Sequence, residues 1–192
     1  MSSPPDSDQM PATEWLFGYG SLVGDRAPAV PGVVVTMAGY RRTWGVAMDN
    51  RDLIPGYKRY VDPRTGRRPA LYVAFLDLSA DPTGTVNGVC VPITGQRLAE
   101  LDRRERQYER VNLGARLPEL GGRVWTYLGS DDGRARRQAG DRAGTTVVAR
   151  AYRDAVLAGF DALGPGARAA FDLSTDDCGC PVIDLVRHDL PV

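Results

Sequence analysis

The chain has 192 residues, a length that suits one domain or two small ones and allows a sizeable buried core. Hydrophobic residues make up 43% and charged residues 25%, as in ordinary globular proteins. Basic and acidic residues number 24 each, so the formal net charge is zero. This balance argues against nucleic acid as the main partner and offers no attraction to an anionic membrane. No apolar run approaches the roughly 18 residues of a spanning helix, so we expect no membrane partner.

Two compositional details bear on chemistry and location. Of the 24 basic residues only Lys58 is a lysine, and the arginines supply planar cations that can pair with carboxylates through two hydrogen bonds. The cysteines are Cys90, Cys178 and Cys180, and this odd, low count predicts reduced thiols and a cytoplasmic protein. A Cys-x-Cys pair with one histidine, His188, is a poor match to a zinc site, so we expect no metal.

The N-terminal half is predicted to be mainly strands. Residues 1–13 are rich in Ser, Pro and Asp, resemble no secretory signal, and are expected to form a disordered tail before a single domain over 14–192. The apolar run 15–19 predicts a buried strand that enters a tight loop. Residues 31–44 predict a second strand, with Gly39 at a bulge or bend.

The middle of the chain shows turn formers and then more strands. Residues 49–69 are polar and predict a long loop of about 20 residues. Two further strands are expected at 70–78 and 84–93, with a turn over 79–82 between them. Thr94 is a fair N-cap for a short helix ending near residue 104.

The second half is predicted to turn from strands to helices. The expected elements are strands at 108–117 and 123–128, a flexible loop over 129–145, and helices at 147–163 and 166–173. Strands that precede helices indicate an α+β protein with a small, mainly antiparallel sheet or barrel and a few flanking helices, rather than a doubly wound fold.

A glycine-rich segment after the first strand is the first candidate site. In the run from Phe17 to Leu22, Gly18 and Gly20 flank Tyr19, so the backbone can turn sharply and its N–H groups can face an anion. The spacing fits neither a dinucleotide loop nor a nucleophile elbow, so Ser21 is not expected to act as an esterase nucleophile. An ordinary glycine-rich turn is the alternative reading.

Two further residues are candidates because of the helix faces they occupy. Leu98, Leu101 and Glu105 recur at helical spacing, which places a carboxylate on an apolar face, a setting suited to a general base. A solvated, ion-paired helix end is the alternative. Tyr152 falls on the apolar face of the later helix, where core packing competes with a role in a site.

Taken together, these segments resemble the γ-glutamylcyclotransferase superfamily. Tyr19-Gly20-Ser21-Leu22 is similar to its Y-G-S-x loop, and residues 101–105 (LDRRE) to the L-D-x-x-E segment that carries its catalytic glutamate. Residues 37–44 are similar to the second-strand region of ChaC-type members, and 125–128 to a late strand. Tyr152 and the glycine seven residues later are similar to the family helix whose tyrosine contacts substrate.

The resemblance implies a reaction that needs no cofactor. A γ-glutamyl amide would cyclise to 5-oxoproline and a free amine, with Glu105 as catalytic acid/base and Tyr19, Gly20, Ser21, Leu22 and Tyr152 as substrate-binding residues. The substrates that fit are γ-glutamyl amino acids, glutathione, γ-glutamyl-ε-lysine and γ-glutamyl-protected intermediates of antibiotic biosynthesis.

Some features leave alternatives open. The segments 49–69 and 129–145 look longer than in compact members, and Arg106 stands where glycine commonly follows the glutamate, which puts the leaving amine in doubt. A leaving group with acid groups would meet arginines, whereas a cationic one would suit Asp131 and Asp132. A non-catalytic module that binds a small ligand on the same fold is the rival reading, and a monomer and a homodimer are both compatible with the sequence.

Overall fold

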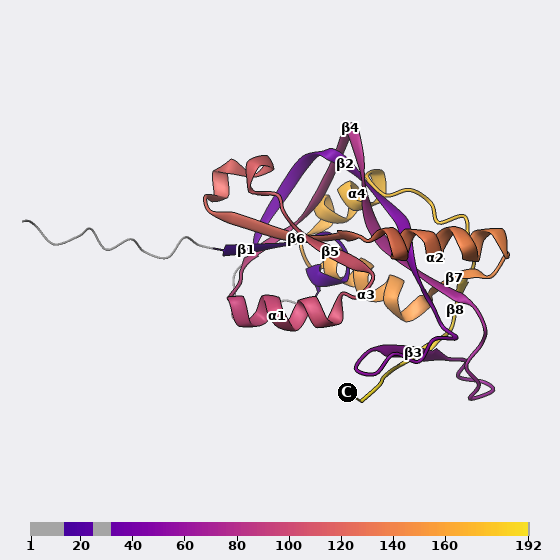
Figure 1. Ribbon diagram of the computed structural model, residues 1–192. Helices are drawn as coiled ribbons and strands as arrows, with labels where there is room; N and C mark the ends of the chain where they lie inside the picture. The colour runs from indigo at the N-terminus through magenta and orange to yellow at the C-terminus, as the bar shows by residue number, and fades with distance from the viewer. Residues whose placement is uncertain (1–13, 25–31, 192) are drawn as a thin grey trace, which may run out of the picture.

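The computed structural model describes residues 14–24 and 32–191 (Figure 1), so the tail expected at 1–13 lies outside the described residues. The described strands are β1 (Glu14–Gly18), β2 (Val33–Asp49), β3 (Lys58–Val61), β4 (Tyr72–Pro92), β5 (Tyr108–Asn112), β6 (Arg123–Gly129), β7 (Thr146–Ala149), β8 (Val182–Ile183) and β9 (Val186–Asp189). The described helices are α1 (Gly95–Arg104), α2 (Asp131–Arg142), α3 (Arg150–Asp161) and α4 (Pro165–Leu173), with short 3-10 helices η1 (Ser21–Val23), η2 (Gly114–Arg116) and η3 (Pro118–Leu120).

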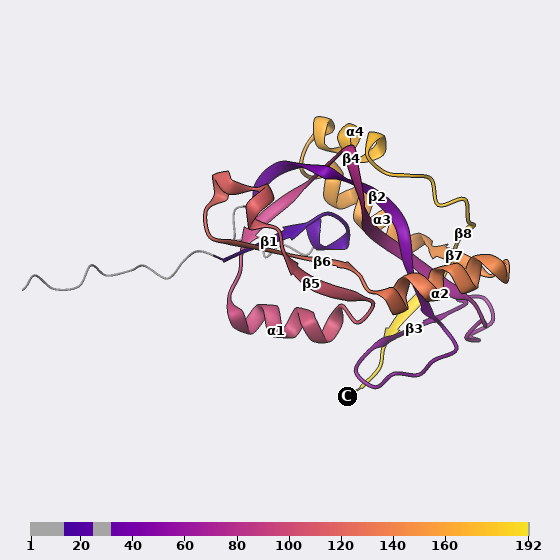
Figure 2. The same ribbon diagram turned by 45° about the horizontal axis from the view of Figure 1, so that its top comes forward.

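The main sheet is built on the long antiparallel pair β2 and β4, which runs from Val33 opposite Cys90 to Asp49 opposite Tyr72. On its other edge β4 pairs antiparallel with β1 and parallel with β7, and the sheet continues through β6 to β5 on one side and to β8 on the other. Figure 2 shows the sheet curled into a half-barrel with the helices around it. The predicted α+β class is confirmed.

A bulge replaces the turn that was predicted at 79–82. Ala38 pairs with Thr85 and Tyr40 with Ala80, so residues 81–84 lie opposite Gly39 alone, and β4 is one bent strand. Gly39 has φ +89°, which strains any other residue, and the bend predicted there is confirmed. Residues 79–82 include turn formers, as predicted. Because β2 pairs with β4 on both sides of the bulge, however, the two halves of β4 stay in one ladder.

The predicted long loop at 49–69 contains strand β3. Lys58 pairs with Asp189 and Val61 with Val186, so β3 and β9 form a second, two-stranded sheet. A four-residue strand has little pattern of its own, and its partner lies near the other end of the described chain. The sequence therefore could not show this pairing.

The predicted flexible loop at 129–145 is largely helix α2. Its N-cap is Ser130, whose side chain accepts a hydrogen bond from the Gly133 N–H. The buried residues of α2 are Gly133 and Gly140, so no apolar stripe marks the helix in the sequence. A Cβ on Gly140 would lie 2.8 Å from the Tyr72 Cβ, which shows how closely α2 lies on the sheet.

Two other boundaries are corrected and one is confirmed. The helix predicted from residue 147 begins at Arg150, because 146–149 form the buried strand β7. The strand predicted over 108–117 ends at Asn112 and gives way to η2. Helix α1 is confirmed with its Thr94 cap and with Leu98 and Leu101 buried.

The cysteines differ from the expected reduced state. Cys178 and Cys180 form a disulfide, whereas Cys90 is free and buried. Arg137 of α2 donates a hydrogen bond to Cys178 Sγ over 3.2 Å, so the bridged turn is fastened to the helix. No helix among the described residues has the length and apolar character needed to cross a bilayer.

Candidate active site

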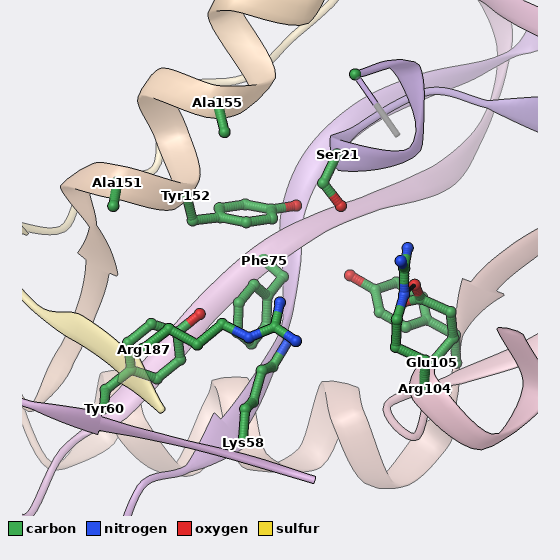
Figure 3. A pocket seen from close by; sticks show the side chains of 12 residues that line it. Ser21, Lys58, Tyr60, Phe75, Arg104, Glu105, Ala151, Tyr152, Ala155 and Arg187 are labelled. Carbon is green, nitrogen blue, oxygen red and sulfur yellow. Dashed lines mark hydrogen bonds and ion pairs between the residues drawn. The ribbon is translucent and has the colours of Figure 1, made fainter. Parts of the chain in front are cut away.

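A cavity of about 400 Å³ opens between the glycine-rich loop after β1, the end of α1, helix α3 and the β3–β9 sheet. Its described lining residues come from all of these elements: Ser21, Gly24, Lys58, Tyr60, Phe75, Arg104, Glu105, Tyr108, Ala151, Tyr152, Ala155 and Arg187. Figure 3 shows Ser21 and Tyr152 on one side, Glu105 across from them, and Lys58 and Arg187 reaching in from the second sheet. A smaller recess that Tyr19, Gly20 and Leu22 help to line adjoins it.

The loop after β1 is held rigidly by its own tyrosine. The buried Tyr19 donates its hydroxyl proton to the Tyr127 carbonyl over 2.6 Å, and the Tyr19 carbonyl accepts from Arg42 Nε over 2.8 Å. Gly20 and Ser21 accept the backbone hydrogen bonds that close η1. The first N–H groups of a helical turn have no acceptor within it, and in η1 these are the N–H groups of Ser21 and Leu22.

Tyr152 reaches the loop from α3. Its ring packs edge-on against Phe75, with centroids 5.0 Å apart, and its hydroxyl accepts from the Leu76 N–H over 3.4 Å. A hydrogen bond links the hydroxyl to Ser21, while burial raises the pKa of Tyr152 well above its ordinary value. The phenol therefore stays protonated at neutral pH and can donate or accept a hydrogen bond.

Helix α3 is seated against the loop through a glycine contact. A Cβ on Gly159 would lie 3.0 Å from the Gly24 backbone nitrogen, so only a glycine lets α3 approach η1 this closely. Tyr152 lies two turns earlier on the same helix, and this close packing sets how far its hydroxyl extends towards Ser21.

Glu105 caps the C-terminus of α1. Its N–H donates to the Leu101 carbonyl over 2.8 Å, which continues the helical pattern by one residue and turns the side chain towards the cavity. The carboxylate is 15% exposed and accepts from Arg104 Nε over 2.9 Å. Glu105 thus lies on the side of α1 that the spacing predicted, although it is the cap residue and not part of the last turn.

Three cations surround the open part of the cavity. Arg104 pairs with Glu105, and Arg187 pairs with Asp189 over 2.6 Å. Lys58 is half-buried, with its ammonium 4.1 Å from the centroid of the Phe75 ring. Burial lowers the pKa of Lys58 to about 8; nearby Glu105 partly offsets this effect, and Arg187 strengthens it.

The structure brings together the six residues that were predicted to carry the proton or bind the substrate. Ser21, Glu105 and Tyr152 line the main cavity, and Tyr19, Gly20 and Leu22 line the adjoining recess. Sequence reasoning missed Lys58, Arg187 and Tyr108, which also line the main cavity. Lys58 could have been noticed as the single lysine of the chain, whereas no feature of the sequence distinguished Arg187 from the other arginines. Residues 14–24 and 32–191 contain no group of three His, Cys, Asp or Glu side chains that could hold a metal ion.

Comparison with known proteins identifies the fold. No protein-family model and no curated protein sequence matches the chain. A solved structure named γ-glutamyl cyclotransferase matches 89% of this chain and 94% of its own, with a TM-score of 0.50 and 11% identity. An uncharacterised protein from Homo sapiens gives the same coverage and TM-score at 12% identity. A glutathione-specific yeast γ-glutamyl cyclotransferase covers 65% of this chain and 72% of its own, with a TM-score of 0.43 and 17% identity. The chain has a γ-glutamyl-cyclotransferase-like fold.

Proposed function

We propose that the protein is a γ-glutamyl cyclotransferase, which releases 5-oxoproline and a free amine from a γ-glutamyl amide. The observation that carries the proposal is the placement of the Glu105 carboxylate in one cavity with Ser21 and Tyr152. Glu105 is the one carboxylate among the described residues that line this cavity. The likeness of the fold to a γ-glutamyl cyclotransferase supports the same function.

The reaction is intramolecular and needs one group to carry a proton. Glu105 accepts a proton from the α-ammonium group of the substrate, and the freed amine attacks the γ-carbonyl carbon. A new C–N bond closes the five-membered ring while the C–N bond of the γ-amide breaks. Glu105 then returns the proton to the departing nitrogen, and the second proton that the ring nitrogen loses passes to the released amine, which leaves as an ammonium ion, so the products together contain all the atoms of the substrate.

The loop and the tyrosines hold the γ-glutamyl part in the bent conformation that ring closure needs. The N–H groups at the start of η1 suit a carboxylate or a developing oxyanion. Tyr108 is tied down by the hydrogen bond that it donates to the Leu76 carbonyl over 2.7 Å, and burial raises its pKa. A preformed pocket of this kind accelerates an intramolecular reaction through orientation.

The first test is 5-oxoproline release by the purified protein, followed by mass spectrometry with γ-glutamyl-alanine, glutathione and γ-glutamyl-ε-lysine as substrates. Glu105→Gln should fold and lose at least about 100-fold in turnover, because general acid–base catalysis typically contributes that much or more. Glu109→Gln, which changes an exposed carboxylate of β5, is the matched control and should keep full turnover. Full turnover by Glu105→Gln would remove Glu105 from the mechanism.

A further inference from the structure

The charge of the cavity is uneven. Beyond Glu105, the open part is bounded by the side chains of Lys58, Arg104 and Arg187. Since Arg104 is paired with Glu105, these two charges offset one another. Arg187 is paired with Asp189, which lies outside the lining of this cavity. The wall that the β3–β9 sheet contributes is therefore positive towards the cavity.

Lys58 is the cation in this wall that lacks a carboxylate partner. Among the described residues it forms no ion pair, and its ammonium rests between the rings of Phe75 and Tyr57, with centroids 4.1 and 5.2 Å away. Burial disfavours its charged form; nearby Glu105 offsets part of this effect, and Arg187 adds to it. A partly desolvated cation beside another cation gains free energy when an anion binds next to it.

The position of this wall assigns it to one part of the substrate. With the γ-glutamyl end at the η1 loop and the departing nitrogen at Glu105, the remainder of the molecule extends into the open cavity. Figure 3 shows the side chains of Lys58 and Arg187 ending in that space, on the side away from Ser21. Asp131 and Asp132, which would suit a cationic leaving group, lie exposed in the first turn of α2 and outside the cavity lining.

We propose that Lys58 and Arg187 form an anion subsite for a carboxylate carried by the leaving amine. The substrates are then γ-glutamyl derivatives of amino acids or small peptides, not of neutral or cationic amines. This inference rests on the proposed cyclotransferase function and adds the class of leaving group. It also gives the β3–β9 sheet a role in specificity, separate from the proton transfer at Glu105.

The test compares two substrates that differ by one charge, γ-glutamyl-alanine and γ-glutamyl-alaninamide. The wild-type protein should prefer the carboxylate substrate by at least about 10-fold in kcat/KM, as expected for a charge-assisted hydrogen bond. Lys58→Met should lower kcat/KM for γ-glutamyl-alanine by about 10- to 100-fold and bring the ratio close to one. Lys58→Arg keeps the charge and should retain most of the preference.

Equal kcat/KM values for the two substrates with wild-type protein would overturn the inference. A Lys58→Met variant that loses equally on both would also overturn it, because Lys58 would then contact the γ-glutamyl part. Failure of the proposed function has a different signature, namely no 5-oxoproline from either substrate.

A binding measurement decides the inference even without turnover. Because the chain has a single lysine, labelling with lysine that carries ¹³C at Cε alone gives one side-chain NMR signal, which reports Lys58 directly. In Glu105→Gln protein, γ-glutamyl-alanine should raise the pKa read from this signal, and γ-glutamyl-alaninamide should not. An unchanged signal at saturating γ-glutamyl-alanine would contradict the subsite.

Discussion

At the scale of single residues, the loop of the candidate site depends on a buried cation that forms no ion pair with any described carboxylate. Arg42 is fully buried between the rings of Phe160 and Phe171, 5.0 and 4.5 Å from their centroids. Besides the Tyr19 carbonyl, it donates to Ser174 Oγ over 2.8 Å. Burial lowers its pKa to about 9, so it stays charged at neutral pH. Five hydrogen-bond donors in a fixed fork allow one side chain to join the loop to the residue after α4.

The proposed role of Lys58 predicts that the substrate selectivity of the site depends on pH. Its pKa of about 8 in the free protein means that the ammonium is mostly charged at pH 7 and mostly neutral at pH 9. Burial is the main cause of this lowered pKa; among the neighbouring charges, Glu105 and Asp189 favour the charged form, and Arg187 and Arg104 oppose it. The preference for γ-glutamyl-alanine over γ-glutamyl-alaninamide should therefore fall as the pH rises through 8.

The measurement is the ratio of kcat/KM for the two substrates between pH 6.5 and 9.5. Both substrates share the γ-glutamyl α-amine and the Glu105 step, so the ratio cancels those ionisations and isolates the leaving-group subsite. In Lys58→Met the ratio should be independent of pH. A wild-type ratio that does not change with pH would show that Lys58 is not the residue responsible.

At the scale of elements, helix α2 depends on small residues and on one ion pair whose carboxylate is buried. Asp77 of β4 is almost fully buried and accepts from the Gly129 N–H over 2.7 Å and from Arg134 Nε over 3.0 Å. Gly133 and Gly140 form the face that lies on the sheet. The attachment therefore rests on close backbone approach and charge and not on the apolar stripe of an ordinary amphipathic helix.

Replacing the second of these glycines should loosen α2. In Gly140→Leu the new Cβ would meet Thr146 Oγ1 at 2.5 Å and Tyr72 Cβ at 2.8 Å. Overpacking of this kind should lower the free energy of unfolding by about 2–3 kcal/mol, measured by urea denaturation. Ala135→Leu, on the exposed face of the same helix, should stay within about 0.5 kcal/mol of wild type. Equal effects of the two substitutions would contradict this account of the packing.

Helices α1 and α2 and the site residues show which features could be predicted from the sequence and which could not. Helix α1 was predictable because its cap and its two buried leucines are local signals. Helix α2 was not, because its contact face is glycine, which carries no hydrophobic pattern. Glu105 and Tyr152 were found from helical spacing and from a family resemblance, whereas Arg187 was not, because a pairing between distant strands brings it to the cavity.

At the scale of the whole molecule, the candidate site joins distant parts of the chain. Its lining extends from Ser21 to Arg187 and includes the start of α3. Between α4 and the last strands, the bridged turn at Cys178 and Cys180 is held to α2 by Arg137. The disulfide thus lies on the segment that leads to β9, which carries Arg187.

Reduction of this disulfide should lower thermal stability modestly. Because the two cysteines are separated by two positions, the chain-entropy estimate is about 1–2 kcal/mol. For a protein of this size that corresponds to a fall of roughly 2–8 °C in Tm on adding a reductant. Burial raises the pKa of the Cys90 thiol to about 12, so this residue should not contribute. A Cys178→Ser/Cys180→Ser variant is the control and should show the lower Tm with no response to reductant; an unchanged wild-type Tm would contradict the prediction.

The pairing of β3 with β9 has a consequence for synthesis on the ribosome. At typical translation rates of about 5–20 residues per second, β3 waits on the order of ten seconds for its partner. During that interval its edge is exposed, and unpaired edges invite association with other chains. Lys58 and Arg59 place two positive charges on the four-residue strand, the usual protection of such an edge. The lysine proposed to receive the leaving group would thus first help keep the nascent chain from aggregating.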